Sequence, residues 1–465
     1  MKRRAWLGLA VIGCVAPISL SAQESRIVSP PSASSQVVPT KPAEPGLKPT
    51  VVQEGTTGVS PTVVGESYDG EYVPSFSERM YGLRDILVRP FSFGWYDDSK
   101  PVSNNLMTSD IEDPYWFKAD MIFGRFKEAK TPPLLTTSTP QESRGIIGNE
   151  GTRILYGGNI DLETHLGTRM TGGFWMEPSQ AWGLEGSYFF LANRTNSFKA
   201  DSQGDPLLAA PFYDSIANQN SAYPIANEAL NDLVQISGLV NVGAHSRIQG
   251  AEFTNLHNIT RQTNRRLDWT WGWRYLNLDE AIFNNLQQGE AAPQGQQFGT
   301  QRLIWDDFGT SNNFNGFNFG LRSQWYAGCW TFDLNGKLAL GVNRNTVQVT
   351  GRTITASPPQ FQPVATRGGI YAQSSNMGET TQHDFSVVPE FEVGVGYYFC
   401  ERWRFTCSYN FMAITNVARP GDQIDNRINP NILDGNSGNP ATPERFHKTS
   451  TFYLSSLVLG LEYRW

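Results

Sequence analysis

The sequence L-V-L-G-L-E-Y-R-W, residues 457–465, alternates between two kinds of side chain. Every second residue is apolar, and the aromatic ones come last: Leu457, Leu459, Leu461, Tyr463 and Trp465. The residues between them are Val458, Gly460, Glu462 and Arg464. Because successive side chains of a β-strand point to opposite faces, this stretch predicts a strand with one apolar face and one small or charged face.

The same alternation recurs along the chain after residue 113. It predicts strands at about 114–126, 165–176, 181–191, 246–257, 266–278, 314–325, 330–341, 384–399, 403–416 and 451–465. The clearest strand places Trp269, Trp271, Trp273 and Tyr275 on one face and Asp268, Thr270, Gly272 and Arg274 on the other. The weakest is 246–257, where the alternation breaks near Glu252 and suggests a β-bulge. A dry core excludes unpaired charges, so we expect the aromatic faces to contact lipid and the polar faces to line a lumen.

Short and long connections alternate between these strands. The turns at 177–180, 326–329 and 400–402 are short, whereas 192–245, 279–313 and 342–383 are long. This order predicts an all-β fold: an antiparallel up-and-down transmembrane β-barrel of about ten strands over 113–465, with short periplasmic turns and long outer loops. A bilayer tolerates no open sheet edge, so the strand ending at Trp465 should close the barrel against the first strand. An extra strand pair around Val347 and Val349 is the alternative, giving twelve strands.

The first 112 residues divide into three predicted segments. Residues 1–22 resemble a secretory signal, with Lys2, Arg3 and Arg4 before an apolar stretch and cleavage after Ala22. Residues 11–14 (V-I-G-C) also resemble a lipobox, which would place a lipid on Cys14 instead. Residues 23–65 are rich in Pro and Ser and predict a disordered linker, and 66–112 form a poorly defined periplasmic segment. Export to the outer membrane is therefore the predicted localisation.

Several classes of function are disfavoured by composition and motifs. The net charge is −7, so the chain does not favour nucleic acid. The five His are scattered, and only His383 is followed by an acid, so we predict no enzyme and no cofactor. Asp422 and Asp425 in R-P-G-D-Q-I-D supply too few oxygen ligands for calcium, so we predict no metal site and read this stretch as a loop that caps the barrel. Cys400 and Cys407 flank a predicted turn, so they are either a local disulfide or two separate thiols.

The inward face of the predicted barrel carries six acids and six bases. The lumen-lining candidates are Arg169, Glu185, Asp268, Arg274, Arg322, Asp333, Lys337, Glu390, Glu392, Arg404, Glu462 and Arg464. One hypothesis is porin-like passive diffusion of small hydrophilic solutes through a narrow charged lumen. The alternative is a plugged structural or adhesive surface barrel that acts through its outer loops, since small barrels are filled by their own side chains. A plugged barrel requires Arg274, Arg322 and Arg404 each to pair with an inward acid.

An ordered series of motifs identifies a family resemblance. These motifs are L-E-G-S-Y-F-F-L at 184–191, R-I-Q-G-A-E at 247–252, W-R-Y-L-N-L-D-E at 273–280, S-S-N-M-G at 374–378, V-V-P-E at 387–390 and N-V-A-R-P-G-D-Q-I-D at 416–425. Residues 114–465 resemble β-barrel porin family seven of planctomycete-type bacteria. The resemblance implies an outer-membrane barrel in contact with outer-membrane lipid and recognised by the barrel assembly machinery through its C-terminal strand. It supports transport less strongly than architecture, and the oligomeric state stays open.

Overall fold

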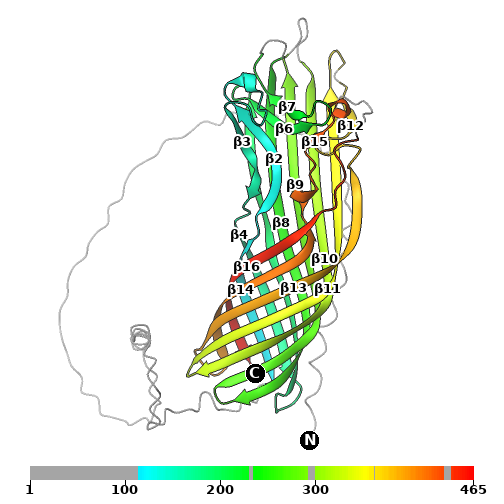
Figure 1. Cartoon of the computed structure of the whole chain (residues 1–465). Coiled ribbons are helices and arrows are strands. Elements are labelled where there is room, and N and C mark those ends of the chain that lie inside the picture. The colour runs from blue at the N-terminus through cyan, green and yellow to red at the C-terminus, as the bar shows by residue number, and fades with distance from the viewer. Residues whose placement is uncertain (1–113, 230–233, 292–298, 361, 434–440) are drawn as a thin grey trace, which may run out of the picture. The chain divides into compact units, whose positions relative to one another are not determined.

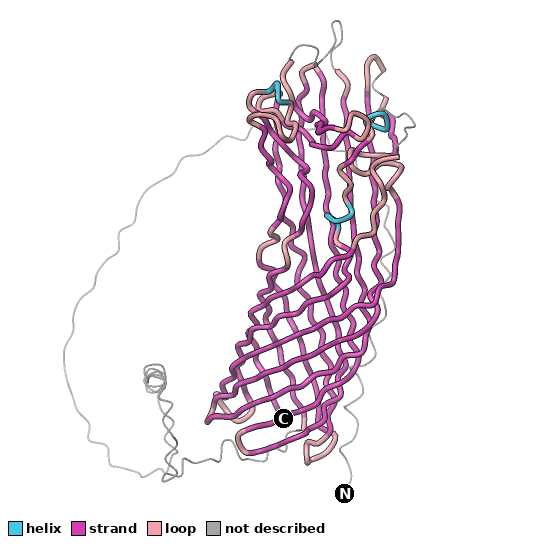
Figure 2. Tube along the Cα trace, viewed as in Figure 1, coloured by secondary structure: helices cyan, strands magenta, loops and turns pink. Residues whose placement is uncertain are grey.

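The computed structural model describes residues 114–229, 234–291, 299–360, 362–433 and 441–465. The predicted signal peptide, linker and 66–112 segment lie outside these residues, as does Cys14. Among the described residues, no helix has the length and apolar character needed to span a bilayer. Strands account for most of this part of the chain (Figure 2).

Ten antiparallel strands form a closed ring (Figure 1). They are β1 (Tyr115–Phe126), β4 (Thr164–Trp175), β5 (Trp182–Ser202), β8 (Ile236–Gln262), β9 (Arg265–Glu290), β10 (Gln301–Ala327), β11 (Trp330–Ala356), β13 (Gly378–Tyr398), β14 (Trp403–Ala418) and β16 (Thr449–Arg464). Around the ring their order is β10-β9-β8-β5-β4-β1-β16-β14-β13-β11, and β11 pairs with β10. The predicted ten-stranded antiparallel barrel is confirmed.

The last strand closes the barrel against the first. β16 pairs with β1 in antiparallel register, with Leu459 opposite Met121. Trp465 continues the ladder through two backbone hydrogen bonds of 3.1 Å with Tyr115, whose ring stacks on the indole at 5.8 Å. The closing strand is thus paired on both sides, since β14 covers its other edge.

The part of the barrel next to the short turns, which we call the membrane half, has an apolar outer surface. Trp269 and Trp273 are 45% and 47% exposed on β9, and Phe317 is 54% exposed on β10. Leu457 and Leu461 of β16 are exposed in the same way. Apolar side chains gathered on the outside of a barrel are the arrangement that a lipid surface requires.

Strands β8 to β11 continue far beyond the membrane half. They contain 26 or 27 residues each, whereas about 9–11 residues suffice to cross a bilayer. The predicted loops at 279–313 and 342–383 are therefore too long, because much of each range belongs to strands. Val347 and Val349 lie within β11 and form no additional pair, so the twelve-strand alternative is wrong for the described residues.

We call the part of the long strands beyond the membrane half the outer half. In the outer half, the inner and outer faces of the strands exchange polarity. On β11, Asp333 points inward and Phe332 outward in the membrane half. Farther along the same strand, Val347 and Val349 point inward and are 2% and 3% exposed, while Gln348 faces outward and is exposed. The outer half therefore has the polarity of a water-soluble β-protein, with an apolar inside and a polar outside.

A second sheet fills the concave side of the outer half. It consists of β2 (Ala129–Ser138), β3 (Thr152–Ile160), β6 (Leu208–Asp214), β7 (Gln219–Ala226) and β15 (Arg427–Ile428), in the order β15-β6-β2-β3 with β7 on β6. Its buried side chains, among them Leu135 and Ile225, share one apolar core with the inward side chains of β8 to β11. β12 (Val364–Arg367) pairs in antiparallel register with the end of β11, and the short helices are η2 (Gln141–Ser143), η3 (Pro420–Gln423) and α2 (Pro430–Leu433). The outer half is thus two packed sheets joined to a barrel.

Candidate functional site in the barrel lumen

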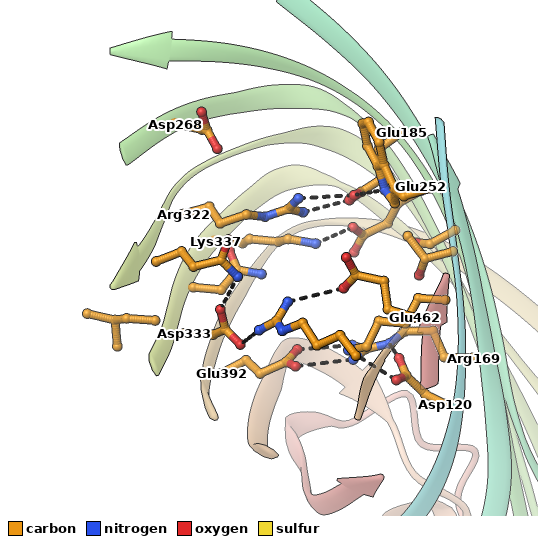
Figure 3. Close-up of a pocket in the computed structure, with 18 of the residues that line it drawn as sticks. Asp120, Arg169, Glu185, Glu252, Asp268, Arg322, Asp333, Lys337, Glu392 and Glu462 are labelled. Carbon is orange, nitrogen blue, oxygen red and sulfur yellow. Dashed lines mark hydrogen bonds and ion pairs between the residues drawn. The ribbon is translucent and has the colours of Figure 1, made fainter. Parts of the chain in front are cut away.

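A polar cavity of about 180 Å³ lies inside the membrane half (Figure 3). All twelve residues predicted to line the lumen border it: Arg169, Glu185, Asp268, Arg274, Arg322, Asp333, Lys337, Glu390, Glu392, Arg404, Glu462 and Arg464. They come from β4, β5, β9, β10, β11, β13, β14 and β16. This volume has room for on the order of ten water molecules.

Four further charged residues border the cavity that the sequence reading did not include. They are Lys118, Asp120, Glu252 and Arg266. Glu252 was missed because a bulge was expected there, but β8 stays in continuous register past it, with Ser187 opposite on β5 and Arg274 opposite on β9. The β8–β9 register shift lies instead between Asn258 and Thr260. With these four residues the lining contains eight acids and eight bases, so it carries no net formal charge.

Arg274 occupies the centre of the deepest group of charges. Its side chain is 1% exposed and lies 3.1 Å from Glu252 and 2.6 Å from Glu390. Lys337 contacts the other oxygen of Glu252 at 2.6 Å, and Asn410 donates to Glu390 at 2.6 Å. Charges from β8, β9, β11 and β13 therefore meet across the lumen.

Arg169 links a second group of charges. Its guanidinium contacts Asp120 at 2.7 Å and donates to both oxygens of Glu392, at 3.1 and 3.2 Å. Lys118 lies 3.0 Å from Asp120, and Ser408 donates to Glu392 at 2.8 Å. Figure 3 shows the bridge from Arg169 to Asp120 on one side and to Glu392 on the other.

The remaining predicted arginines are also paired. Arg322 forms a bidentate pair with Glu185, at 2.6 and 3.0 Å, and the Trp116 indole donates to the same carboxylate. Arg404 contacts Asp333 and, at 3.1 Å, Glu462. Bidentate pairing holds a guanidinium in a fixed orientation.

The two remaining cations of the cavity lining are Arg464 and Arg266, and each is paired with an acid. Arg464 lies 2.6 Å from Glu462. Arg266 lies 2.9 Å from Asp268 and covers the ring of Trp175 at 4.0 Å. Arg274, Arg322 and Arg404 thus all pair with inward acids, which is the arrangement that the plugged hypothesis requires.

Directly beyond the charged cavity, apolar side chains pack across the barrel and leave a small cavity of about 30 Å³ on the side of the charges. The layer consists of Ile122, Phe126, Leu191, Ile248, Leu276, Leu278, Phe314, Ala339, Val388, Met412, Ile414, Val417, Phe452, Leu454 and Val458, contributed by nine of the ten strands. Each of these residues is 0–7% exposed. Gly124 permits this packing, because a Cβ there would lie 2.4 Å from Leu191 and 2.9 Å from Leu454. We call these fifteen residues the apolar layer.

The R-P-G-D-Q-I-D segment lies on the outer side of the apolar layer. Arg419 contacts Glu280 at 2.7 Å and donates to the carbonyl of Glu128 at 2.9 Å, and both charged side chains are almost fully buried. Asp422 accepts from Ser450. These contacts hold the connection between β14 and β16 inside the barrel, as expected of a capping loop.

The other sequence candidates are not brought together as sites. Asp425 is paired with Arg427 at 3.0 Å, and the described residues contain no group of three His, Cys, Asp or Glu arranged to hold a metal. His383 and Asp384 point to opposite faces of β13, with His383 exposed and Asp384 accepting from Asn345. Cys400 lies at a turn and Cys407 on the lipid-facing side of β14, in register with Val395 and Leu459, and both thiols are free.

The chain is similar to one protein family and, more distantly, to several solved outer-membrane proteins. Residues 116–465 match the family described as Putative beta barrel porin-7. No curated protein matches the chain. Among solved structures, it is similar to the outer membrane protease OmpT from Escherichia coli (8% identity, TM-score 0.36, covering 76% of this chain and 97% of that one). It is also similar to the Pseudomonas putida toluene transporter TodX (7%, 0.23, 78% and 94%) and to a Pseudomonas aeruginosa FadL homologue (6%, 0.21, 76% and 90%). Similarities this distant carry no argument about activity.

Proposed function

The chain belongs to the beta barrel porin-7 family, and we propose that it forms an outer-membrane barrel whose lumen is closed and which anchors a β-sandwich at the cell surface. In this account the chain acts through its outer half and is not an enzyme. The observation that supports the proposal most directly is the apolar layer, which separates the charged cavity from the outer half.

A hydrated pore would wet the side chains that face it. In the apolar layer, Leu276 and Phe314 are 1% exposed and Phe452 is 0% exposed. Returning a buried Leu or Phe to water costs roughly 1.5–3 kcal/mol, so opening the layer requires several such costs together. The barrel at rest should therefore be closed to solutes.

The charges in the lumen support the same interpretation. Eight acids and eight bases compensate one another, and Arg169, Arg274 and Arg322 are each held by a short contact with a carboxylate from another strand. Such a network favours neither cations nor anions. It fills the membrane half and fixes the relative positions of the strands.

Passive diffusion of small hydrophilic solutes is the second candidate. The polar cavity of about 180 Å³ favours it, because an open pathway would begin in such a chamber. It requires the apolar layer to move aside, together with the segment that Arg419 holds in place. The family description names a porin, so this candidate deserves a direct comparison.

Swelling of vesicles distinguishes the two candidates. The full chain is refolded into phospholipid vesicles, which are then diluted into isotonic arabinose. We expect swelling no faster than that of protein-free vesicles, because the apolar layer excludes the sugar. Swelling that increases with protein content and decreases with the size of the sugar would support diffusion and contradict the closed barrel.

A further inference from the structure

One site on the outer surface of β11 and β13 combines apolar side chains with an arginine and a histidine. Val342 and Phe385 are opposite one another in register, face outward and are 47% and 62% exposed. The next outward pair along the same strands is Arg344 and His383, and both are exposed. The change from apolar to polar side chains, with a guanidinium on one strand and an imidazole on the other, thus occurs at the same register position on two neighbouring strands.

This change lies where the outer boundary of the membrane is expected. Trp330, 45% exposed, and Val342 are twelve positions apart on β11. At about 3.3 Å per residue this is roughly 40 Å along the strand, or about 28 Å along the membrane normal at a tilt of about 45°. The apolar band of such barrels is about 25 Å tall. Arg344 therefore lies at the level of lipid headgroups.

Three arginines elsewhere on the outer surface are neutralised by acids. Arg125 lies 2.7 Å from Asp161, and Arg247 lies 2.8 Å from Asp279. Arg194 likewise contacts Glu163.

Arg344 and His383 differ from these arginines, because neither forms an ion pair with any residue that the structure describes. Asp384 is adjacent in sequence but points inward, where it accepts from Asn345 at 2.7 Å. The outward residues Thr346 and Thr381 lie at the next position and hydrogen-bond one another at 3.1 Å.

We propose that Arg344 and His383 bind the phosphate headgroup of a lipid in the outer leaflet, with its acyl chain against Val342 and Phe385. A guanidinium suits a phosphate because it offers several N–H donors in one plane, and the two threonine hydroxyls lie within the same patch. Val342 and Phe385 are the adjacent outward pair on the membrane side, so we expect the phosphate to belong to a lipid whose acyl chain covers them. The site depends on the position of the barrel in the membrane and is independent of whether the lumen is open.

Native mass spectrometry of the refolded full chain tests this site. The protein in detergent micelles is mixed with dioleoyl phosphatidic acid, or with dioleoyl phosphatidylcholine of the same acyl chains. We expect the wild type to retain phosphatidic acid preferentially, and the double variant Arg344→Gln/His383→Gln to lose at least about tenfold in affinity, because a bidentate phosphate contact is worth at least a factor of that size.

The matched control is Arg352→Gln, which removes another exposed arginine of β11 that lies in the outer half, away from the apolar band. This variant should retain phosphatidic acid as the wild type does. Equal retention by the double variant, or equal loss in Arg352→Gln, would overturn the site. Displacement of the lipid by millimolar inorganic phosphate would show a site for a free anion and would also overturn the assignment to a lipid.

Discussion

At the scale of single residues, Arg274 shows how the lumen is held together. Its side chain is 1% exposed and is shared between Glu252 and Glu390. Replacing Arg274 with Ala leaves two buried carboxylates without this partner, and we expect a loss of about 3–5 kcal/mol in the free energy of unfolding. The exposed pair Arg247–Asp279 offers the matched control, where Arg247→Ala should cost about 0–1 kcal/mol. Urea unfolding in lipid vesicles, followed by tryptophan fluorescence, measures both, and equal losses would refute the structural role of the network.

The sequence predicts most of the lumen-lining charges, because the face of the strand on which a side chain lies determines whether it enters the lumen. Once the apolar face is assigned to lipid, the opposite face follows from the period of two. Lys118 and Asp120 alternate with apolar residues on β1 and could have been included on this signal. Glu252 is harder to recognise, because β8 changes polarity near it: Ile248 points inward a few residues before the inward acid. The pairing of each charge across the barrel depends on strand order and tilt, which the sequence pattern does not contain.

At the scale of the strand, the exchange of polarity within β11 is open to a direct test. Val347→Arg places a charge among apolar side chains of the outer half and should destabilise the protein by more than about 3 kcal/mol. Gln348→Arg changes the neighbouring outward residue and should stay within about 0.5 kcal/mol. Urea unfolding of the two variants measures the loss in the free energy of unfolding. A large loss for Gln348→Arg and a small loss for Val347→Arg would mean that Gln348, and not Val347, points inward.

The outer half could not be predicted from the alternation that identifies the membrane half. In V-Q-V-T-G-R-T, the period of two continues past Val342, but the apolar residues now point inward. A search for apolar faces directed at lipid therefore ends each strand too early and leaves a long loop. The inner sheet was missed for a different reason. Its strands, from β2 to β15, come from three separate connections, and β15 contains only two residues.

A buried ion pair between Arg419 and Glu280 contributes to holding the capping segment in the barrel. Replacing Arg419 with Ala leaves Glu280 buried without its partner and removes the contacts to the Lys127 and Glu128 carbonyls. We expect residues 419–428 to become accessible, so limited proteolysis should cleave there faster than in the wild type. Arg427→Ala, which removes a side chain 43% exposed, should leave the cleavage rate nearly unchanged. Equal rates in all three proteins would mean that the segment is held by other contacts.

At the scale of the whole molecule, two regions of opposite polarity share the same strands. The membrane half is polar inside and apolar outside, and the outer half is apolar inside and polar outside. The apolar layer lies where one pattern gives way to the other. Recognition of the closing strand by the barrel assembly machinery, the bacterial group and the cleavage of the signal peptide stay predictions.

Single-channel conductance in a planar bilayer tests the closed lumen most directly. The full chain is refolded, and its folding is verified by heat-modifiable mobility in gels. We expect no steps from the wild type, and steps from the triple variant Leu276→Ala/Phe314→Ala/Phe452→Ala, which removes much of the apolar layer. The control variant Phe317→Ala/Leu321→Ala/Leu457→Ala alters the lipid-facing surface and should stay silent. Steady ohmic steps from the wild type, with an ion preference shifted by Arg322→Glu or Glu392→Gln, would contradict the account.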